Sequence, residues 1–399
     1  MKKIFDNILR SMLLLLPALL QGCTEDVPMV NLGIDDTYLV YRMQKLPLES
    51  ALTGSSYRWT QTWPDGRRAV VSTSRRYIFL AETEGQYILD FEIIDDDTPF
   101  ASQTVVNVLH EEIEYSPYIA HVYEYNPAPG QFINTMPKYE DGDTYASMLQ
   151  KVEESISGVN DVMVSLGGFG GYVTFGFDHT VVNHPGEADI RIWGNAFYEL
   201  TDQDKKGGSA EPGIVMVSYD VNCNGKPDDA WYELKGSDHY NPATIHNYSI
   251  TYRRPEASAR SKDIPWTDSE GVEGVLKVNS FHQQSYFPEW LGEEPITFSG
   301  TRLPGNAVDV SGNGFYYILY CFGWGYVDNH PNEYVDLNSF DISNAVDANG
   351  MPVELPGVDF VRVYTSLNQD CGWLGETSTE LSKAQDLHIK IEQGSLPNP

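Results

Sequence analysis

The feature that most constrains the fold of this chain is a series of short segments in which apolar and polar residues alternate. Turn residues such as Gly, Pro, Asn and Asp separate these segments. Alternation with a period of two is typical of a strand that buries one face, and short apolar runs between turns indicate strands buried on both faces. The clearest examples are residues 77–80, 85–91, 173–177, 189–193, 214–217, 248–252, 316–320 and 360–364. We therefore predict an all-β protein.

Helical spacing stands out in one segment, residues 143–158. Met148, Val152 and Ile156 recur every four residues, Asp143 occupies an N-cap position, and Gly158 marks the end. We predict one short helix there. Residues 255–270 are predicted to form a long insertion.

The strand pattern indicates two domains. A chain of 399 residues exceeds what one hydrophobic core usually supports. We predict an immunoglobulin-type sandwich over residues 34–112 and a large jelly-roll sandwich, which includes the helix, over residues 113–395.

The N-terminus predicts export and lipid anchoring. Residues 1–22 have the basic start and short apolar stretch of a bacterial signal peptide, too short for a spanning helix. The sequence Leu-Gln-Gly-Cys at 20–23 resembles a lipobox, which implies acylation of Cys23 and a tether over residues 23–33. The acidic pair at 25–26 resembles the signal that places Bacteroidota lipoproteins on the outer face of the outer membrane. A secretion signal with an incidental cysteine is the alternative.

The net charge of the chain limits the classes of partner that it is expected to bind. The formal net charge is −31, and so acidic a surface repels phosphate backbones and attracts divalent cations. Nucleic acid is not an expected partner, and membrane contact is expected only through the lipid anchor.

The remaining cysteines and the histidines give no metal signature. Without Cys23, the chain keeps Cys223, Cys321 and Cys371, so at most one disulfide can form. The spacing does not decide whether Cys321 and Cys371 pair or stay as buried thiols. No Cys-x-x-Cys pair or His/Cys cluster indicates zinc.

Residues 220–229 resemble the first half of an EF-hand calcium loop. Oxygen-bearing side chains stand at positions 1, 3, 5 and 9, and Gly225 stands at position 6 for the tight bend. Trp231 replaces the usual glutamate at position 12, and a plain Asn-Gly turn is the alternative. We predict a structural Ca²⁺ site between two strands. Its candidate ligands are Asp220, Asn222, Asn224, the carbonyl of Lys226, Asp228 and Asp229.

Catalytic motifs are missing from the sequence. It has neither a Gly-x-Ser-x-Gly elbow nor a His-Glu-x-x-His pair, and its acids are too numerous for any pair to identify a glycosidase cleft. We predict a protein that is not an enzyme, with no catalytic residues.

Two aromatic loops, residues 281–290 and 321–330, are the better indication of a binding surface. Their rings alternate with glycines and amides, a composition suited to planar or sugar ligands. The alternative is that the rings pack beneath the loops. The candidate ligand contacts are Phe322, Trp324, Tyr326, Tyr286 and Trp290.

Further segments carry a family resemblance. In the first domain they are residues 57–60, 64–66, 85–91 and 104–108, and in the second 181–186, 194–197, 210–218, 231–234, 324–329, 340–342 and 358–365. The first set resembles a PKD-like module. Together they resemble the Bacteroidota "cell surface protein" lipoproteins, which join such a module to a jelly roll and are often encoded beside vitamin B12 transporters.

This resemblance implies a surface protein that captures a corrinoid such as vitamin B12 and delivers it to a TonB-dependent transporter. A calcium-dependent glycan-binding or adhesive protein is the second interpretation, and a glycoside-processing enzyme is the third.

Overall fold

The computed structural model describes residues 32–94, 100–199, 206–256, 262–292 and 294–389. The predicted signal peptide, the lipidation site Cys23 and nearly all of the tether lie outside these residues. The described chain divides into two compact units. The N-terminal unit takes residues 32–38, 47–77 and 86–106, and the C-terminal unit takes residues 39–46, 78–85 and 107–389.

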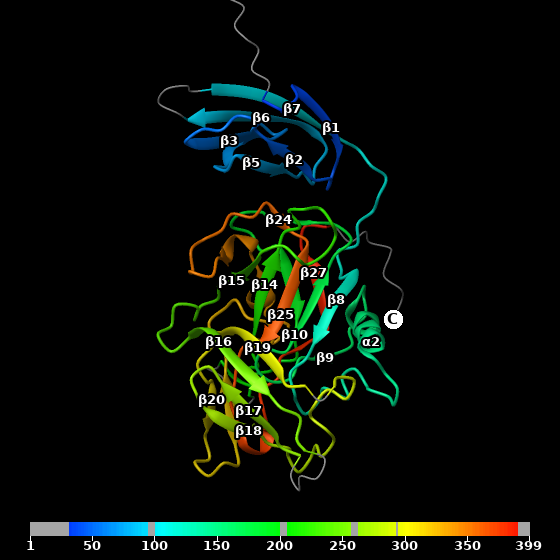
Figure 1. Cartoon of the computed structure of the whole chain (residues 1–399), viewed down its shortest axis with the longest axis vertical. Coiled ribbons are helices and arrows are strands. Elements are labelled where there is room, and N and C mark those ends of the chain that lie inside the picture. Colours follow the sequence, from blue (N-terminus) through cyan, green and yellow to red (C-terminus); the bar gives the residue numbers. More distant parts are fainter. Residues whose placement is uncertain (1–31, 95–99, 200–205, 257–261, 293, 390–399) are drawn as a thin grey trace, which may run out of the picture. The chain divides into compact units, whose positions relative to one another are not determined.

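The first part of the chain forms a five-stranded sheet in the order β1-β7-β6-β3-β4 and a two-stranded sheet, β2-β5 (Figure 1). Their bounds are β1 Thr37–Tyr41, β2 Leu46–Glu49, β3 Ser56–Thr62, β4 Arg68–Ser72, β5 Arg76–Phe79, β6 Gly85–Ile94 and β7 Phe100–Leu109. Trp59 is buried, with its ring centroid 4.4 Å from that of Phe91 and 5.7 Å from that of Tyr77. The strands predicted here from alternation are confirmed.

A six-stranded antiparallel sheet in the order β23-β15-β14-β25-β10-β8 organises the C-terminal unit. Its strands are β8 His121–Asn126, β10 Tyr172–Gly176, β14 Gly213–Ser218, β15 Trp231–Leu234, β23 Ala345–Val346 and β25 Phe360–Thr365. Strand β25 lies between β14 and β10, and Val363 pairs with Val215 on one side and Val173 on the other.

The two faces of this sheet pack against different layers. Val361 and Val363 project into one core, which also contains Ile190 and Ile192 of β12. Tyr364 projects from the opposite face and packs with Leu303 and Leu367. Because successive side chains of a strand point to opposite faces, the six residues of β25 contribute to the cores on both sides of the sheet.

Smaller sheets complete these layers. They are β22-β12-β27, β11-β24, β9-β26, β13-β21-β20 and β18-β17-β16-β19. Their bounds are β9 Val164–Ser165, β11 Val181–Val182, β12 Ile190–Trp193, β13 Gly207–Gly208, β16 Ile245–Tyr252, β17 Ile264–Asp268, β18 Glu273–Leu276, β19 Ile296–Arg302, β20 Ala307–Asp309, β21 Tyr317–Tyr320, β22 Ser339–Phe340, β24 Gly357–Val358, β26 Glu380–Leu381 and β27 Lys383–Asp386. The described residues also form the 3-10 turns η1 Val335–Asn338, η2 Ile342–Asn344 and η3 Gly372–Leu374.

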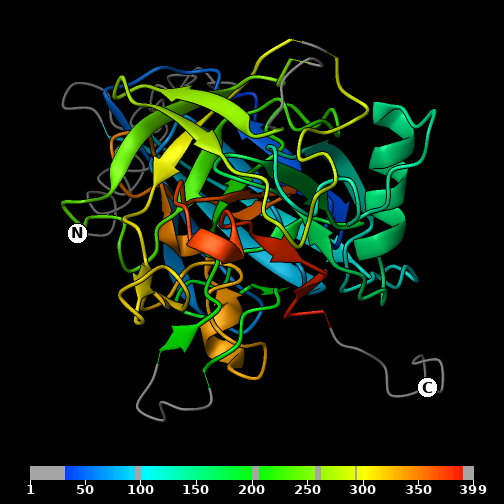
Figure 2. The ribbon, with the colours of Figure 1, turned by 90° about the horizontal axis from the view of Figure 1, so that it is seen from below.

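Helix α2 (Tyr145–Ile156) lies along one side of the C-terminal unit (Figure 2) and buries Met148, Val152 and Ile156, as predicted. Its N-cap is Thr144, not Asp143. The Thr144 hydroxyl accepts a hydrogen bond from the Ser147 amide, and the Ser147 hydroxyl accepts one from the Thr144 amide, forming a capping box.

The predicted all-β fold with a single α-helix is confirmed for the described residues. The predicted insertion at 255–270 is wrong in part, because strand β17 forms there and pairs with β16 and β18. None of the described helices combines the length and apolar character needed to cross a membrane.

A buried histidine ties the end of β27 to the segment between β10 and β11. His179 Nε2 lies 2.8 Å from Asp386 Oδ2, and its Nδ1 lies 2.7 Å from Asp178 Oδ1. Burial alone would lower the pKa of His179, but the two carboxylates outweigh it and raise the pKa to about 9. The charged imidazolium therefore stabilises the fold.

We predict that replacing His179 by Gln removes a pH-dependent part of stability. A raised histidine pKa contributes fully below the unfolded value of about 6.5 and is lost as pH rises through about 9. The difference between wild type and H179Q should shrink by up to about 3 kcal/mol between pH 6 and pH 10. Urea unfolding at several pH values measures it, and a constant difference would contradict the assignment.

Candidate functional site

A groove of about 370 Å³ lies in the C-terminal unit where several segments that are distant in the sequence meet. Strands β17, β18 and β19 supply one wall, and the chain after β25 supplies the other. The floor includes Gly168 and Phe169, which lie between β9 and β10. Residues that line it are Trp266, Asp268, Leu276, Arg302, Asn368, Gln369 and Glu376.

The groove combines an aromatic surface with fixed polar groups. Trp266 pairs across strands with Gly274, and a Cβ on Gly274 would lie 2.3 Å from the indole ring. Glycine therefore lets the ring lie against the neighbouring backbone. The half-buried indole gives the groove an apolar wall.

Hydrogen bonds position the polar groups of the groove. Asn368 donates to the Tyr248 hydroxyl at 2.9 Å, and that hydroxyl donates to Asp268 Oδ2 at 2.9 Å. Arg302 lies over the Tyr248 ring, 4.4 Å from its centroid, and pairs with Glu270 at 3.1 Å. These contacts hold amide, carboxylate and guanidinium groups along one cleft, an arrangement that suits a polar ligand with an apolar face.

Glu376 is a groove acid in which one carboxylate oxygen lacks a hydrogen-bond partner within the described part of the chain. Its side-chain Oε1 accepts a hydrogen bond from the Gln131 amide at 2.6 Å, while its buried Oε2 has no hydrogen-bond partner among the described residues. Burial raises the pKa of Glu376 to about 7. A buried carboxylate without a cation is costly, so this group gains a proton readily near neutral pH.

A second acidic group contains the buried Asp328 and Glu380 and the partly buried Glu211, whose candidate ligand oxygens lie within 4.8 Å of one another. Asp328 Oδ1 accepts from the amides of Asn195 and Ala196, and its Oδ2 accepts from the Glu380 amide. Burial raises the pKa of Asp328 to about 7, and burial followed by the Asp328 charge raises that of Glu380 to about 8.

No Lys, Arg or His of the described chain forms an ion pair with these three acids. Their oxygen ligands are of the kind that Ca²⁺ prefers, and a divalent cation would relieve their mutual repulsion. No local motif in the sequence marks this group, because Glu211 precedes β14, Asp328 follows Val327 and Glu380 begins β26.

The predicted calcium loop connects β14 to β15, between two strands as expected. The side chains at positions 1, 3, 5 and 9 converge. Asp220 accepts from the backbone amides of Asn224 and Gly225, and the Asn222 and Asn224 side chains donate to Asp228.

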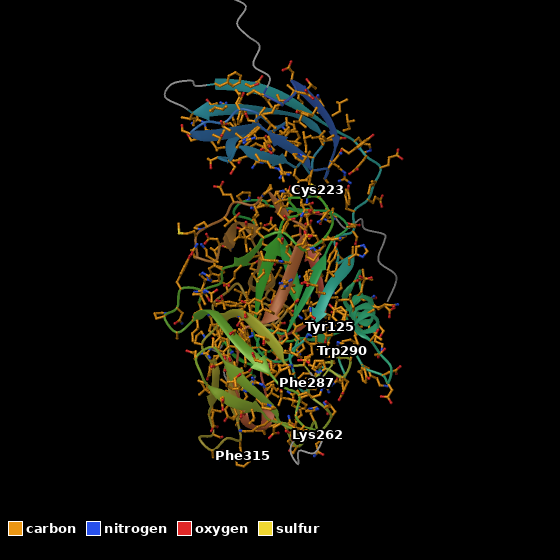
Figure 3. The ribbon with its side chains drawn as sticks, viewed as in Figure 1. Tyr125, Cys223, Lys262, Phe287, Trp290 and Phe315 are labelled. Carbon is orange, nitrogen blue, oxygen red and sulfur yellow. The ribbon has the colours of Figure 1, made fainter. Side chains whose placement is uncertain are left out.

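The rest of the loop supports this conformation. Gly225 has a φ of +70°, which glycine adopts without strain. The Asp229 carboxylate accepts from the Val221 amide, and the Lys226 amide donates to the Asn224 side chain. Cys223 of this loop lies at the opposite end of the C-terminal unit from Phe315 (Figure 3).

The five predicted aromatic contacts do not form one site. Tyr286 and Tyr326 are buried, so the expectation of exposed rings is wrong for them. Trp290 stacks on Tyr125 with a centroid separation of 5.9 Å (Figure 3).

The other two predicted contacts lie on the second loop. Phe322 is half-buried and packs edge-on against Tyr326, with centroids 5.6 Å apart. Trp324 remains exposed. Most of these rings therefore fill space beneath the loops, which was the alternative interpretation. Cys223, Cys321 and Cys371 are free thiols in this structure, so Cys321 and Cys371 do not pair.

No family model matches the sequence, and no curated protein matches it either. Among solved structures, the "SusE-like protein BT2857" aligns at 10% identity over 87% of this chain and 94% of its own, with a TM-score of 0.29. A structure titled "Structural basis for the promiscuous specificity of the carbohydrate-binding modules from the beta-sandwich super family" aligns at 9% identity over 87% and 93%, with a TM-score of 0.14. Likenesses this low carry no argument about function.

We predict that replacing Glu376 by Gln stabilises the protein at alkaline pH. A carboxyl whose folded pKa is raised from 4.5 to about 7 costs stability as pH rises from about 4.5 through 7. E376Q should resemble wild type at pH 5 and be more stable by up to about 3 kcal/mol at pH 8. Urea unfolding at both pH values measures this, with E273Q, at an exposed position of β18, as the control. Equal shifts at both pH values would contradict the burial argument.

Proposed function

We propose that this chain is a lipid-anchored, non-catalytic binding protein of the bacterial cell surface. The groove between β17, β18, β19 and the segment after β25 is its ligand site. The observation that carries the proposal is that Trp266 and several hydrogen-bonded polar groups line the same cleft. Such clefts recognise ring-bearing polar molecules by combining apolar contact with a few oriented hydrogen bonds.

Three groove acids have partners that favour binding over proton transfer. Asp268 Oδ1 accepts from the amides of residues 270 and 272, and its Oδ2 accepts from Tyr248. Glu270 pairs with Arg302, and Asp370 pairs with Lys277. These carboxylates hold the groove in shape, which supports a binding role.

The family resemblance supports one ligand, a corrinoid such as vitamin B12, with a TonB-dependent transporter as partner. A glycan is the second candidate. It is favoured by a specific observation, since an indole face flanked by Asn368, Gln369 and Arg302 offers stacking and hydrogen bonds to a sugar.

We further propose that Ca²⁺ supports the fold. The converging side chains of the 220–229 loop are one candidate site. The acidic group of Glu211, Asp328 and Glu380 is the second candidate site. Ca²⁺ would bind either place through oxygen ligands, and its charge would offset the desolvation of the buried acids.

We predict that W266A weakens ligand binding at least tenfold, because it removes the apolar wall. Cyanocobalamin and a panel of soluble glycans are the probes, titrated by calorimetry. The matched control is W324A, which removes an exposed indole outside the groove and should leave affinity unchanged. The groove assignment fails if W324A abolishes binding and W266A does not. Binding of neither ligand class by the wild type would reject both candidates.

We predict that Ca²⁺ raises the melting temperature of EDTA-treated protein. At one hundred times its dissociation constant, a ligand adds about 2.7 kcal/mol to stability. E380Q should lose most of the gain, because it removes a ligand from the buried acidic group, whereas D228N should lose only the part due to the loop. An unchanged melting temperature in saturating Ca²⁺ would contradict the proposal, and Mg²⁺ serves as the control ion.

A further inference from the structure

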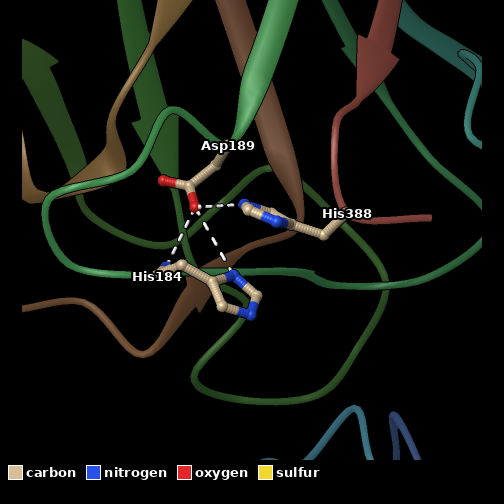
Figure 4. A group of neighbouring side chains, drawn as sticks. All are labelled: His184, Asp189 and His388. Atoms are coloured by element: carbon tan, nitrogen blue, oxygen red, sulfur yellow. Dashed lines mark hydrogen bonds and ion pairs between the residues drawn. The ribbon is translucent and has the colours of Figure 1, made fainter. Parts of the chain in front are cut away.

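Strand pairing brings two histidines and an aspartate together, and none of the three lines the groove (Figure 4). His184 and Asp189 lie in the connection from β11 to β12, and His388 is the second residue after β27. Ile190 pairs with Asp386 in the antiparallel register of β12 and β27, and the Leu387 amide donates to the Asp189 carbonyl at 2.8 Å. The register of one strand pair therefore fixes where these side chains meet.

Asp189 is the fixed centre of this group. Its side chain is fully buried, its Oδ2 accepts from the Ile342 amide at 2.8 Å, and its Oδ1 accepts from the His184 amide at 2.9 Å. His388 Nε2 lies 3.0 Å from the same Oδ1, and His184 Nδ1 lies 3.7 Å from it. Figure 4 shows both imidazoles turned toward this one oxygen.

We propose that His184, Asp189 and His388 form a Zn²⁺ site that joins the start of β12 to the chain after β27. Imidazole nitrogens and a carboxylate oxygen are the ligands of many zinc sites, and metal–ligand distances of about 2.0–2.2 Å place tetrahedral ligands roughly 3.3 Å apart. The observed separations of 3.0 and 3.7 Å bracket that value.

Binding would require small rearrangements of the two rings. Their centroids are 3.8 Å apart, so coordination would turn the imidazoles away from each other while Asp189 stayed in place. Zinc would also replace the contact of His184 Nδ1 with the Val182 carbonyl at 3.2 Å.

The surroundings of the two imidazoles are also compatible with a zinc site. His184 Nε2 lies 3.1 Å from Glu82 Oε2, within the same compact unit. A carboxylate on the far nitrogen of a metal-binding imidazole commonly orients the ring. Three protein ligands leave a fourth position for water, and the partial exposure of His184 and His388 gives the ion a way in.

A second group, Glu233, His239 and His246, makes a useful comparison. Glu233 Oε1 pairs with His239 Nδ1, and Oε2 accepts from the Thr301 hydroxyl. His246 contacts Thr301 through Nδ1 and the His239 carbonyl through Nε2. His246 therefore bonds to Thr301 and to a backbone carbonyl rather than to Glu233. In the first group, by contrast, both imidazoles approach the same oxygen, Asp189 Oδ1.

The test is calorimetric titration of ZnCl₂ into the tag-free, chelator-treated full chain. We expect one equivalent of zinc to bind wild type, affinity at least tenfold weaker in H388A, and unchanged affinity in H246A. Circular dichroism checks that H388A is folded. H184A is the second variant and should weaken binding by a similar factor.

X-ray absorption on the zinc-loaded protein should show two imidazole ligands and oxygen. The proposal is overturned if wild type binds no zinc, if H388A and H184A bind as wild type does, or if H246A alone loses binding.

Discussion

The alternation of side chains along β25 is the constraint on which the C-terminal unit depends. Val361 and Val363 enter the core beneath β12, whereas Arg362 and Tyr364 face the other layer. The Tyr364 hydroxyl accepts from the Thr301 amide at 2.9 Å, which docks β19 onto the sheet. The chain then continues from β25 into Asn368 and Gln369 of the groove, so the register of this strand places two groove walls together.

Buried carboxylates are the second theme of the structure. Glu376 lies at the groove, and Asp328 and Glu380 lie in a separate group, each with its pKa raised by burial. Their desolvation weakens the fold as pH rises, unless protons or cations compensate. At Asp328, three backbone amides donate hydrogen bonds that partly offset the loss of hydration. A bound divalent cation would offset more of it. The formal net charge of −31 also attracts divalent cations to the protein.

Local patterns in the sequence predicted most of the fold. Period-two alternation identified the strands, four-residue spacing identified α2, and the spacing of Asp220, Asn222 and Asn224 predicted that their side chains converge. The N-cap prediction failed at Asp143, because the hydroxyl of Thr144 accepts the first-turn amide bond instead. The strand at 264–268 was missed, because a short segment beside prolines and charges carries a weak periodic signal.

The sites were harder to predict because distant segments build them. The groove is lined by residues near 168, 266, 302 and 368. No local sequence motif indicates that these four segments lie together in the fold. Glu211 and Asp328 stood within segments that marked the family resemblance, but nothing local indicated that they approach Glu380. Tyr286 and Tyr326 looked like exposed rings among glycines and amides, yet tertiary packing buries them. Burial of this kind depends on the completed fold rather than on neighbouring residues.

Hydrogen–deuterium exchange with a bound ligand tests the central claim most directly, because it maps the site without assuming a ligand class. The chain should be measured with whichever corrinoid or glycan saturates it, against the unliganded protein. The account predicts slower exchange in residues 264–277 and 366–377, with the 321–330 loop unchanged. Protection confined to the 321–330 or 281–290 loop, with the groove segments unaffected, would contradict it.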